Sequence, residues 1–287
     1  MKTIFTFDLE RGYEPLDIVK YREIIQRLSS TYPWNFEIRQ ETIKNTHEDW
    51  IKLQKDCYLD YRDCYSIYTP RLNSYEKYLL IFFEMPDKIR EMCIAHNIKY
   101  LNFMVSKIRF PGLENTIMVE SNLDIGPSIS DEELKGYIPE FYKINRYKTP
   151  YTHIYPRFEG KTIALGQMYG DRTVIFDGKS HSVLDYDFQA DIFRPHPLKK
   201  LCQPVKYQEE VSLAKAKGLE VIEEGNIYQI LHSCKKVIGI SSSTLYEAEL
   251  MGKEVDFLGE KEYIRNAKIL WWKDIDQKFW EHIRSQV

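Results

Sequence analysis

The sequence predicts a two-domain α/β protein with a cleft between its domains. Strand-like segments alternate with helical ones, a pattern typical of parallel sheets with helices on both faces. The alternation starts again after residues 139–161, a stretch of prolines and aromatic residues without a clear period. The chain of 287 residues also suits two domains of roughly 100–150 residues each. We therefore expect an N-terminal α/β domain in residues 1–155 and a C-terminal α/β domain in 156–287 that ends in a helical tail.

The first domain is expected to begin with a strand and a helix. Alternating, β-rich residues predict the strand in 2–10, and apolar residues near helical spacing predict the helix in 14–30. Further strands are expected in 35–40, 100–110 and 115–122. Helical patterns cover 48–68 and 74–97, and we expect Pro86 to break the second of them.

The second domain repeats the alternation in shorter pieces. Its strands are expected in 161–168, 190–197, 235–243, 254–260 and the end of 207–225. Its helices are expected at the start of 207–225 and in 226–234 and 243–253. The tail carries Trp271, Trp272, Phe279 and Trp280 near helical spacing. We expect this aromatic stripe to pack in a core or between domains, and contact with a membrane surface or a partner is the alternative.

Composition excludes several classes of protein. The net charge of −3 gives no global basic field that would attract nucleic acid. The five cysteines form no CxxC pair and no metal-ligand spacing, which favours reduced thiols in a cytosol. No segment has the length and apolarity of a membrane span or a signal peptide. We expect a cytoplasmic protein, with peripheral association at the inner membrane or with a polysaccharide-assembly complex left open.

Four hydroxyl residues, Ser241 to Thr244, follow an expected strand and begin an expected helix. Serine and threonine are good N-caps, and a helix N-terminus also offers free N–H groups and partial positive charge to a phosphate. Capping and phosphate binding therefore both remain open. One turn further on, the Glu247 carboxylate is placed either to accept hydrogen bonds from a ribose diol or simply to interact with the helix dipole.

The segment RPHPLKK, residues 194–200, also follows an expected strand. Pro195 and Pro197 hold His196 on a stiff, extended piece of chain. Ligands of open α/β sheets collect at the carboxyl ends of strands, so both motifs point to one edge of the second sheet. His196 is a candidate donor to a phosphate oxygen, with Lys199 or Arg194 adding positive charge.

Three carboxylates are candidates for catalytic work. Asp171 follows Gly166 and Gly170 and is placed either in a turn or at the cleft as a nucleophile or base. Glu120 ends an expected strand of the first domain and is a candidate to face the same cleft. Asp124 is a further candidate, although the sequence Asp-Ile-Gly-Pro that it begins is also typical of an ordinary turn.

The order of these motifs resembles that of a known family. The set is Gly166-Gln167 with Asp171, His196-Pro197, Asn226 with Ile230 and Leu231, and Ser241 through Val255. It resembles bacterial GT-B glycosyltransferases that use CMP-activated 2-keto sugars, closest to the capsule and lipopolysaccharide β-Kdo transferases. The resemblance covers about residues 160–260 and is weak across the first half. It implies a GT-B-like fold, in which two Rossmann-like α/β domains face each other across a cleft.

The resemblance also implies residue roles. His196 and Ser241, Ser242 and Ser243 would hold the CMP phosphate, with Lys199 beside them, and Glu247 would hold the ribose. Asp171 matches the aspartate that in retaining β-Kdo transferases is thought to attack the anomeric carbon, and Gln167 and Arg172 would lie near the donor sugar. Glu120 matches only loosely an acidic residue of the acceptor domain. The segment GQMYGD departs from the more acidic version in capsule enzymes, which leaves the subfamily open.

The implied activity is transfer of Kdo from CMP-Kdo to a saccharide or glycolipid acceptor. Its leaving group has no pyrophosphate for a metal to bridge, so no metal and no other cofactor are expected. Asp185 and Asp187 form a formal DxD match, which we interpret as a turn. A carboxylate such as Asp171 would stabilise an oxocarbenium-like transition state or form a covalent adduct, so retention and inversion both remain open.

Three alternatives remain at this point. A CMP-sialic acid transferase would share the nucleotide and differ in the sugar. A non-catalytic sugar-nucleotide-binding protein would bind CMP without turnover. A GT-B enzyme that uses UDP sugars would also be compatible with the serine and glutamate pattern.

Overall fold

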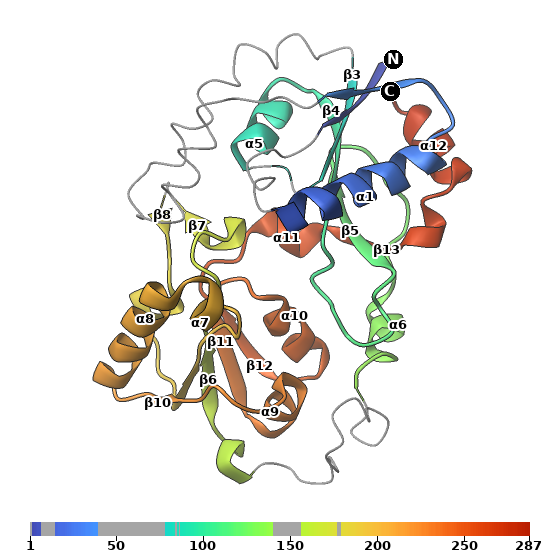
Figure 1. Cartoon of the computed structure of the whole chain (residues 1–287). Helices are drawn as coiled ribbons and strands as arrows, with labels where there is room; N and C mark the ends of the chain where they lie inside the picture. Colours follow the sequence, from blue (N-terminus) through green and yellow to red (C-terminus); the bar gives the residue numbers. More distant parts are fainter. Residues whose placement is uncertain are drawn as a thin grey trace.

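The computed structural model describes residues 2–6, 15–39, 78–83, 85, 87–139, 156–176 and 179–287. The helix expected in 48–68 and most of the expected domain junction lie outside these residues. The predicted α/β class is confirmed, because the described residues form two largely parallel sheets with helices packed against them (Figure 1).

The first sheet has six strands in the order β13-β5-β4-β3-β1-β2. Strands β1, β2, β3 and β4 run parallel, whereas β5 is antiparallel to β4 and to β13. The bounds are β1 (Lys2–Thr6), β2 (Phe36–Arg39), β3 (Tyr78–Phe83), β4 (Lys99–Met104), β5 (Thr116–Ser121) and β13 (Lys268–Trp271). Strands β1, β2 and β5 lie within the segments expected to be strands, whereas β4 starts one residue before the expected segment 100–110 and ends at Met104.

Strand β3 corrects one prediction. Residues 74–97 have a helical pattern in the sequence, but Tyr78–Phe83 form a central parallel strand and the helix α5 (Asp87–Ala95) starts only after Pro86. The run YLLIFF is apolar at every position, and five of its six side chains are buried. A strand covered on both faces loses the alternation of exposed and buried positions, so periodicity cannot distinguish it from a buried helix.

The second sheet has five parallel strands in the order β10-β9-β6-β11-β12. Their bounds are β6 (Thr162–Leu165), β9 (Ile192–Arg194), β10 (Glu220–Val221), β11 (Lys236–Gly239) and β12 (Glu254–Phe257). Counted along the chain from β6, the order is 3-2-1-4-5, which is that of a Rossmann-type sheet. The strand order therefore reverses between β6 and β11, and the carboxyl ends of these two strands flank the point where such sheets bind ligands.

Short helices connect the strands of the second sheet. They are α7 (Lys199–Cys202), α8 (Pro204–Ala216), α9 (Ile227–Ser233) and α10 (Ser243–Leu250). A hairpin of β7 (Ile175–Phe176) and β8 (Lys179–Ser180) follows the 3-10 helix Arg172–Val174. Helix α9 starts at the N-cap Asn226, and Gly252 ends the α10 turn with a φ of 76°, a conformation that favours glycine. These local signals explain why the sequence predicted this half well.

The remaining helices belong with the first sheet. They are α1 (Pro15–Thr31), α6 (Asp131–Lys135), α11 (Glu262–Asn266) and α12 (Gln277–Arg284). Trp280 of α12 is fully buried beside Phe5, Tyr32 and Phe103, so the expected packing role of the aromatic tail is confirmed for this residue. The boundary expected at residue 155/156 assigns the tail to the second half of the chain, but β13 and α12 complete the first sheet and its core (Figure 1).

Candidate functional site

The candidate site lies at the carboxyl ends of β6, β9 and β11. Gly166 follows β6, and a Cβ there would come within 3.1 Å of the Pro195 Cα, so glycine allows the two segments to approach. Gln167 bridges the point where the strand order reverses, because its Oε1 accepts a hydrogen bond of 2.9 Å from the Ser241 N–H. The structure thus brings the glycine–glutamine, histidine and serine motifs to one edge, as the sequence predicted.

The His196 imidazole has a defined tautomer. Its Nδ1 accepts a hydrogen bond of 3.2 Å from the Leu198 N–H, so in the neutral ring the proton is on Nε2. Burial and the neighbouring Lys199 and Arg109 charges lower the pKa of His196, while Asp171 opposes them. The ring is therefore neutral at pH 7 and offers an Nε2–H donor.

The three serines of the motif do different things. The Ser241 hydroxyl is buried and donates to the Thr173 carbonyl at 2.7 Å, which ties β11 to the 3-10 helix Arg172–Val174. Ser242 is the N-cap of α10 and accepts from the Thr244 N–H. Ser243 is the first residue of α10 and has no hydrogen bond from its hydroxyl within the described part of the chain. Of the three serines, Ser243 is therefore the one whose hydroxyl makes no hydrogen bond among the described residues and can meet a ligand at the N-terminus of this helix.

Asp171 occupies a turn beside His196. Its Oδ1 accepts hydrogen bonds from the Thr173 N–H at 2.9 Å and the Thr173 hydroxyl at 2.8 Å. Gly170 precedes it with a φ of 76°, which explains the glycine. These two hydrogen bonds place Asp171 in a turn. Its charge also raises the pKa of the His196 imidazole, so the two side chains lie near each other. The side chain of Arg172 lies outside the described residues.

The basic residues around His196 correct the sequence analysis. Lys199 is 2% exposed and its ammonium is 2.7 Å from the Glu210 carboxylate. The Arg194 guanidinium donates at 2.8 Å to the carbonyls of Glu224 and Gly225. We therefore remove Lys199 and Arg194 from the candidate phosphate contacts, because both side chains already pair with a carboxylate or with carbonyls of the second domain. Lys200, the last basic residue of RPHPLKK, is 2.6 Å from the Glu223 carboxylate.

Glu247 is buried on α10 and connects the two domains. Its Oε1 accepts a hydrogen bond of 2.7 Å from the Arg109 N–H, which belongs to the segment after β4, and lies 3.4 Å from the Tyr228 hydroxyl. Burial raises the pKa of Glu247 to about 7, against the hydrogen bond and charge of Arg109. The described residues give its Oε2 no hydrogen bond, so this oxygen is available to a ribose hydroxyl.

Glu120 is held within the first domain. Its Oε1 accepts hydrogen bonds from the Arg90 Nε at 2.9 Å and from the Tyr100 hydroxyl, and its Oε2 is buried with no hydrogen-bond partner among the described residues. In the β4–β5 register it stands opposite Asn102. None of its contacts among the described residues is to the second sheet, so its catalytic role stays a prediction without structural support.

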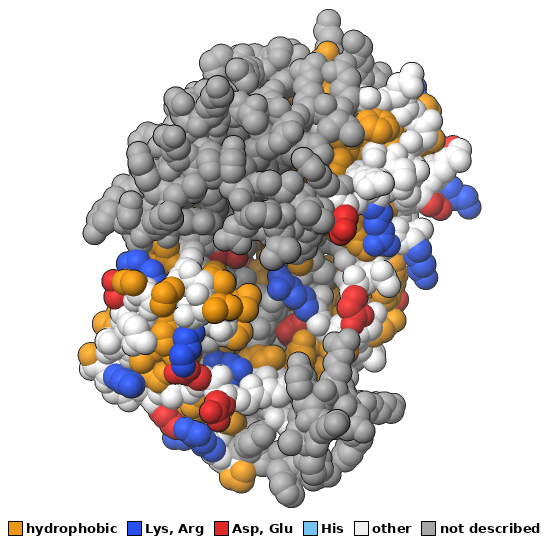
Figure 2. All heavy atoms as spheres, viewed as in Figure 1, with side chains coloured by type: hydrophobic (Ala, Val, Ile, Leu, Met, Phe, Trp, Pro, Cys, Tyr) orange, Lys and Arg blue, Asp and Glu red, His pale blue; other side chains and the backbone are white. Residues whose placement is uncertain are grey.

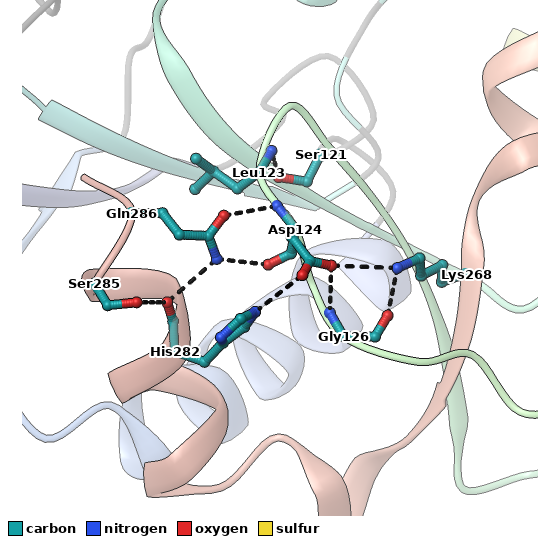
Figure 3. A network of polar contacts seen from close by, with 8 residues as sticks. All are labelled: Ser121, Leu123, Asp124, Gly126, Lys268, His282, Ser285 and Gln286. Atoms are coloured by element: carbon teal, nitrogen blue, oxygen red, sulfur yellow. Dashed lines mark hydrogen bonds and ion pairs between the residues drawn. The ribbon is translucent and has the colours of Figure 1, made fainter.

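Asp124 fastens the C-terminus to the first domain (Figure 3). Its Oδ1 accepts from the Gly126 N–H at 3.0 Å, and its Oδ2 is 3.5 Å from the His282 Nε2. The Gln286 side chain bonds both the N–H and the carbonyl of Asp124, at 2.8 and 2.7 Å. This is the turn role that the sequence offered as the alternative to catalysis.

Two residues of the site were missed by sequence reasoning, Arg109 and Tyr228. The Tyr228 hydroxyl donates to the Arg109 carbonyl at 3.1 Å. In the sequence, Arg109 falls inside the strand expected in 100–110, and only the end of β4 at Met104 puts it in a segment that follows a strand. Nothing in the sequence shows which residues of the second half this segment contacts.

No group of three or more metal-ligating side chains is present in the part of the chain that the structure describes. Asp185 is the last residue of the 3-10 helix Val183–Asp185 and forms a capping box with Ser182, whose N–H donates to its Oδ2 at 2.7 Å, so the formal DxD match begins at the end of a single helical turn. Across the same residues, no helix combines the length and apolarity needed to cross a membrane.

Among known proteins, this chain is similar only in fold to some solved structures. No protein-family model matches the chain, and no curated protein does. Solved structures of glycosyltransferases are similar to it. They include two KpsC structures from Thermosulfurimonas dismutans, described as a β-Kdo 2,7 transferase and a β-Kdo 2,4 transferase. Each is 14% identical and covers 88% of this chain and 78% of its own, with TM-scores of 0.41 and 0.39. This similarity transfers no residue roles.

Proposed function

We propose that this protein is a GT-B-like glycosyltransferase that moves Kdo from CMP-Kdo to a saccharide or glycolipid acceptor of a bacterial surface polysaccharide. Its two Rossmann-like domains face each other, the second domain binds the donor, and no metal takes part. The observation that carries the proposal is the set of groups at the strand-order reversal of the second sheet. These are the His196 Nε2–H, the N-terminus of α10 with Ser243, and the Glu247 Oε2.

These groups fit a nucleoside monophosphate. A phosphate at the α10 N-terminus would receive hydrogen bonds from backbone N–H groups and from His196. Glu247 lies one turn further along the helix, where a ribose attached to that phosphate would present its hydroxyls. The motif order described above resembles the CMP-dependent family, and β-Kdo transfer is also the activity named for the two similar solved structures. Because that likeness is one of fold, the proposal depends on the site.

We assign the chemical step to Asp171. Its carboxylate would attack the anomeric carbon of Kdo while the bond from that carbon to the phosphate oxygen breaks, and CMP would leave with the bonding electrons. The neutral His196 and the helix dipole would stabilise the charge that develops on the phosphate. The acceptor hydroxyl would then displace Asp171 and give its proton to a base, so the configuration would be retained.

The acceptor would approach from the first domain. A pocket of about 410 Å³ lies at the carboxyl ends of β3 and β4, where Phe83, Val105 and Trp272 line it together with Arg109. Ligands of open α/β sheets bind at such ends. Since Arg109 also contacts Glu247 through its backbone, the pocket adjoins the proposed donor site.

The test is thermal stabilisation of the purified protein by CMP, UMP, UDP, AMP and GDP without metal. A ligand that binds only the native state raises its melting temperature by mass action. We expect a shift with CMP and little with the others, followed by turnover of CMP-Kdo. A larger shift with UDP would replace the proposal by a UDP-sugar transferase, and preference for CMP-sialic acid in turnover would replace Kdo by a sialic acid. Binding of CMP without any turnover would indicate a non-catalytic binding protein.

A further inference from the structure

Within the described side chains, the segment RPHPLKK gives the candidate phosphate site no free cation. Arg194, Lys199 and Lys200 are each engaged by carbonyls or carboxylates of the second domain. A dianionic phosphate held only by neutral donors would lose much of the stabilisation that a charge-assisted hydrogen bond provides. Among the described side chains, a positive charge that these contacts leave near His196 is that of Arg109 in the first domain.

The second domain holds the backbone of Arg109 at two points. The Arg109 N–H donates to the Glu247 Oε1 at 2.7 Å, and the Arg109 carbonyl accepts from the Tyr228 hydroxyl at 3.1 Å. The next residue, Phe110, places its ring 6.0 Å from that of Tyr228. Residue 109 therefore has a fixed position over α9 and α10, although it belongs to the first domain.

The side chain of Arg109 is not used by the fold. It is exposed, and its Nε makes a single hydrogen bond of 3.3 Å to the Ser106 carbonyl. Its two terminal nitrogens have no hydrogen bond within the described residues, so the part of the guanidinium that binds oxyanions in pairs is free. The Arg109 charge lowers the pKa of both His196 and Glu247, which is consistent with a guanidinium that lies near both side chains. Figure 2 shows basic and acidic side chains together where the two lobes meet.

We propose that Arg109 binds an oxyanion of the donor, opposite His196, and so completes the donor site from the first domain. The inference rests on the proposed function for the identity of the donor. The group that Arg109 would bind is an oxyanion. In a CMP-linked 2-keto sugar this oxyanion is either the phosphate or the sugar carboxylate. Glu247 and Tyr228 act as positioning residues, because they hold the Arg109 backbone where its side chain reaches the ligand.

The experiment compares wild type with Arg109→Gln, which removes the charge and keeps most of the side chain. Dissociation constants are measured for CMP, cytidine, inorganic phosphate and CMP-Kdo. We expect CMP and inorganic phosphate to bind about ten to a hundredfold more weakly, as for loss of one charge-assisted contact, with cytidine unchanged. If only CMP-Kdo loses affinity, the oxyanion is the sugar carboxylate, which also supports the proposal. Unchanged affinity for all four ligands, or equal losses that include cytidine, would overturn it.

Two further variants make the outcome specific. Arg157→Gln removes an exposed arginine that pairs with Glu220, and it should leave every constant unchanged. Tyr228→Phe removes the hydroxyl that holds the Arg109 carbonyl. It should weaken CMP binding in wild type but add little in the Arg109→Gln background. Additive losses in the double variant would overturn the positioning role.

The two proposals fail in different ways. If wild type does not bind CMP, the proposed function is wrong, and the inorganic phosphate measurement still tests Arg109. If wild type binds CMP and Arg109→Gln binds it equally well, along with CMP-Kdo and inorganic phosphate, only the inference about Arg109 is wrong.

Discussion

The raised pKa of Glu247 makes a prediction about stability that can be worked out in sign and size. Glu247 is 3% exposed, and the pKa of its carboxyl rises from 4.5 in a free side chain to about 7 in the fold. Between these values the unfolded chain has lost the proton while the folded chain still holds it. The unfolded state then binds fewer protons, so this group lowers stability as pH rises through that interval. Its favourable contribution is complete below pH 4.5 and is lost above pH 7.

The size follows from the same two values. At about 1.4 kcal/mol for each pH unit between 4.5 and 7, the ionised Glu247 costs the fold about 3 kcal/mol at pH 8. Glu247→Gln removes this cost, because an amide does not ionise and its oxygen can still accept the Arg109 N–H. We expect the free energy of unfolding of Glu247→Gln, relative to wild type, to rise by about 2 to 3 kcal/mol between pH 5 and pH 8.

The assay is the melting temperature of both proteins without nucleotide at pH 5 and pH 8. A gain of this size corresponds to a relative shift of about 5 °C or more in a chain of this length. Glu254→Gln, at an exposed glutamate that begins β12, is the matched control for loss of a surface charge. The reasoning is refuted if Glu247→Gln differs from wild type by the same amount at both pH values.

The remaining predictions concern the site and the core. His196→Ala should weaken CMP binding about tenfold in calorimetric titration, and an unchanged constant would remove its phosphate role. Asp171→Asn should lower turnover at least a hundredfold and leave CMP affinity intact, because the Asn oxygen can still accept from the Thr173 N–H; near-normal turnover would exclude the catalytic role. Trp280→Ala should cost about 3–5 kcal/mol in chemical denaturation, since the ring is fully buried, and a loss below 1 kcal/mol would contradict that packing. Chelator should leave turnover unchanged, whereas loss that a divalent metal restores would contradict the metal-free mechanism.

The second domain could be predicted from the sequence to a large extent. Its strands are short and end at strong local signals, such as the N-caps Asn226 and Ser242 and the positive-φ Gly252. These signals act within a few residues, so a sequence displays them directly. The strand β3 was missed because its burial on both faces comes from neighbours far along the chain.

The sequence predicted several residues of the candidate site but not their pairings. The sequence placed positive charge around His196, but the acids and carbonyls that engage Lys199, Lys200 and Arg194 are 11 to 31 residues away. Arg109 is 87 residues from His196 and belongs to the other domain, so no local pattern connects them. Charge can be read from a sequence, whereas its neutralisation depends on tertiary contacts.

The return of the chain to its first sheet has a consequence for biosynthesis. Strand β13 pairs with β5, although about 145 residues separate them, and α12 follows it into the first core. A ribosome releases the chain from its N-terminus, so most of the first domain is synthesised early and remains incomplete until β13 and α12 emerge. During that interval the edge of β5 is open to pairing with other chains. A nascent chain that stalls after β12 would therefore carry a complete second sheet and an unfinished first one.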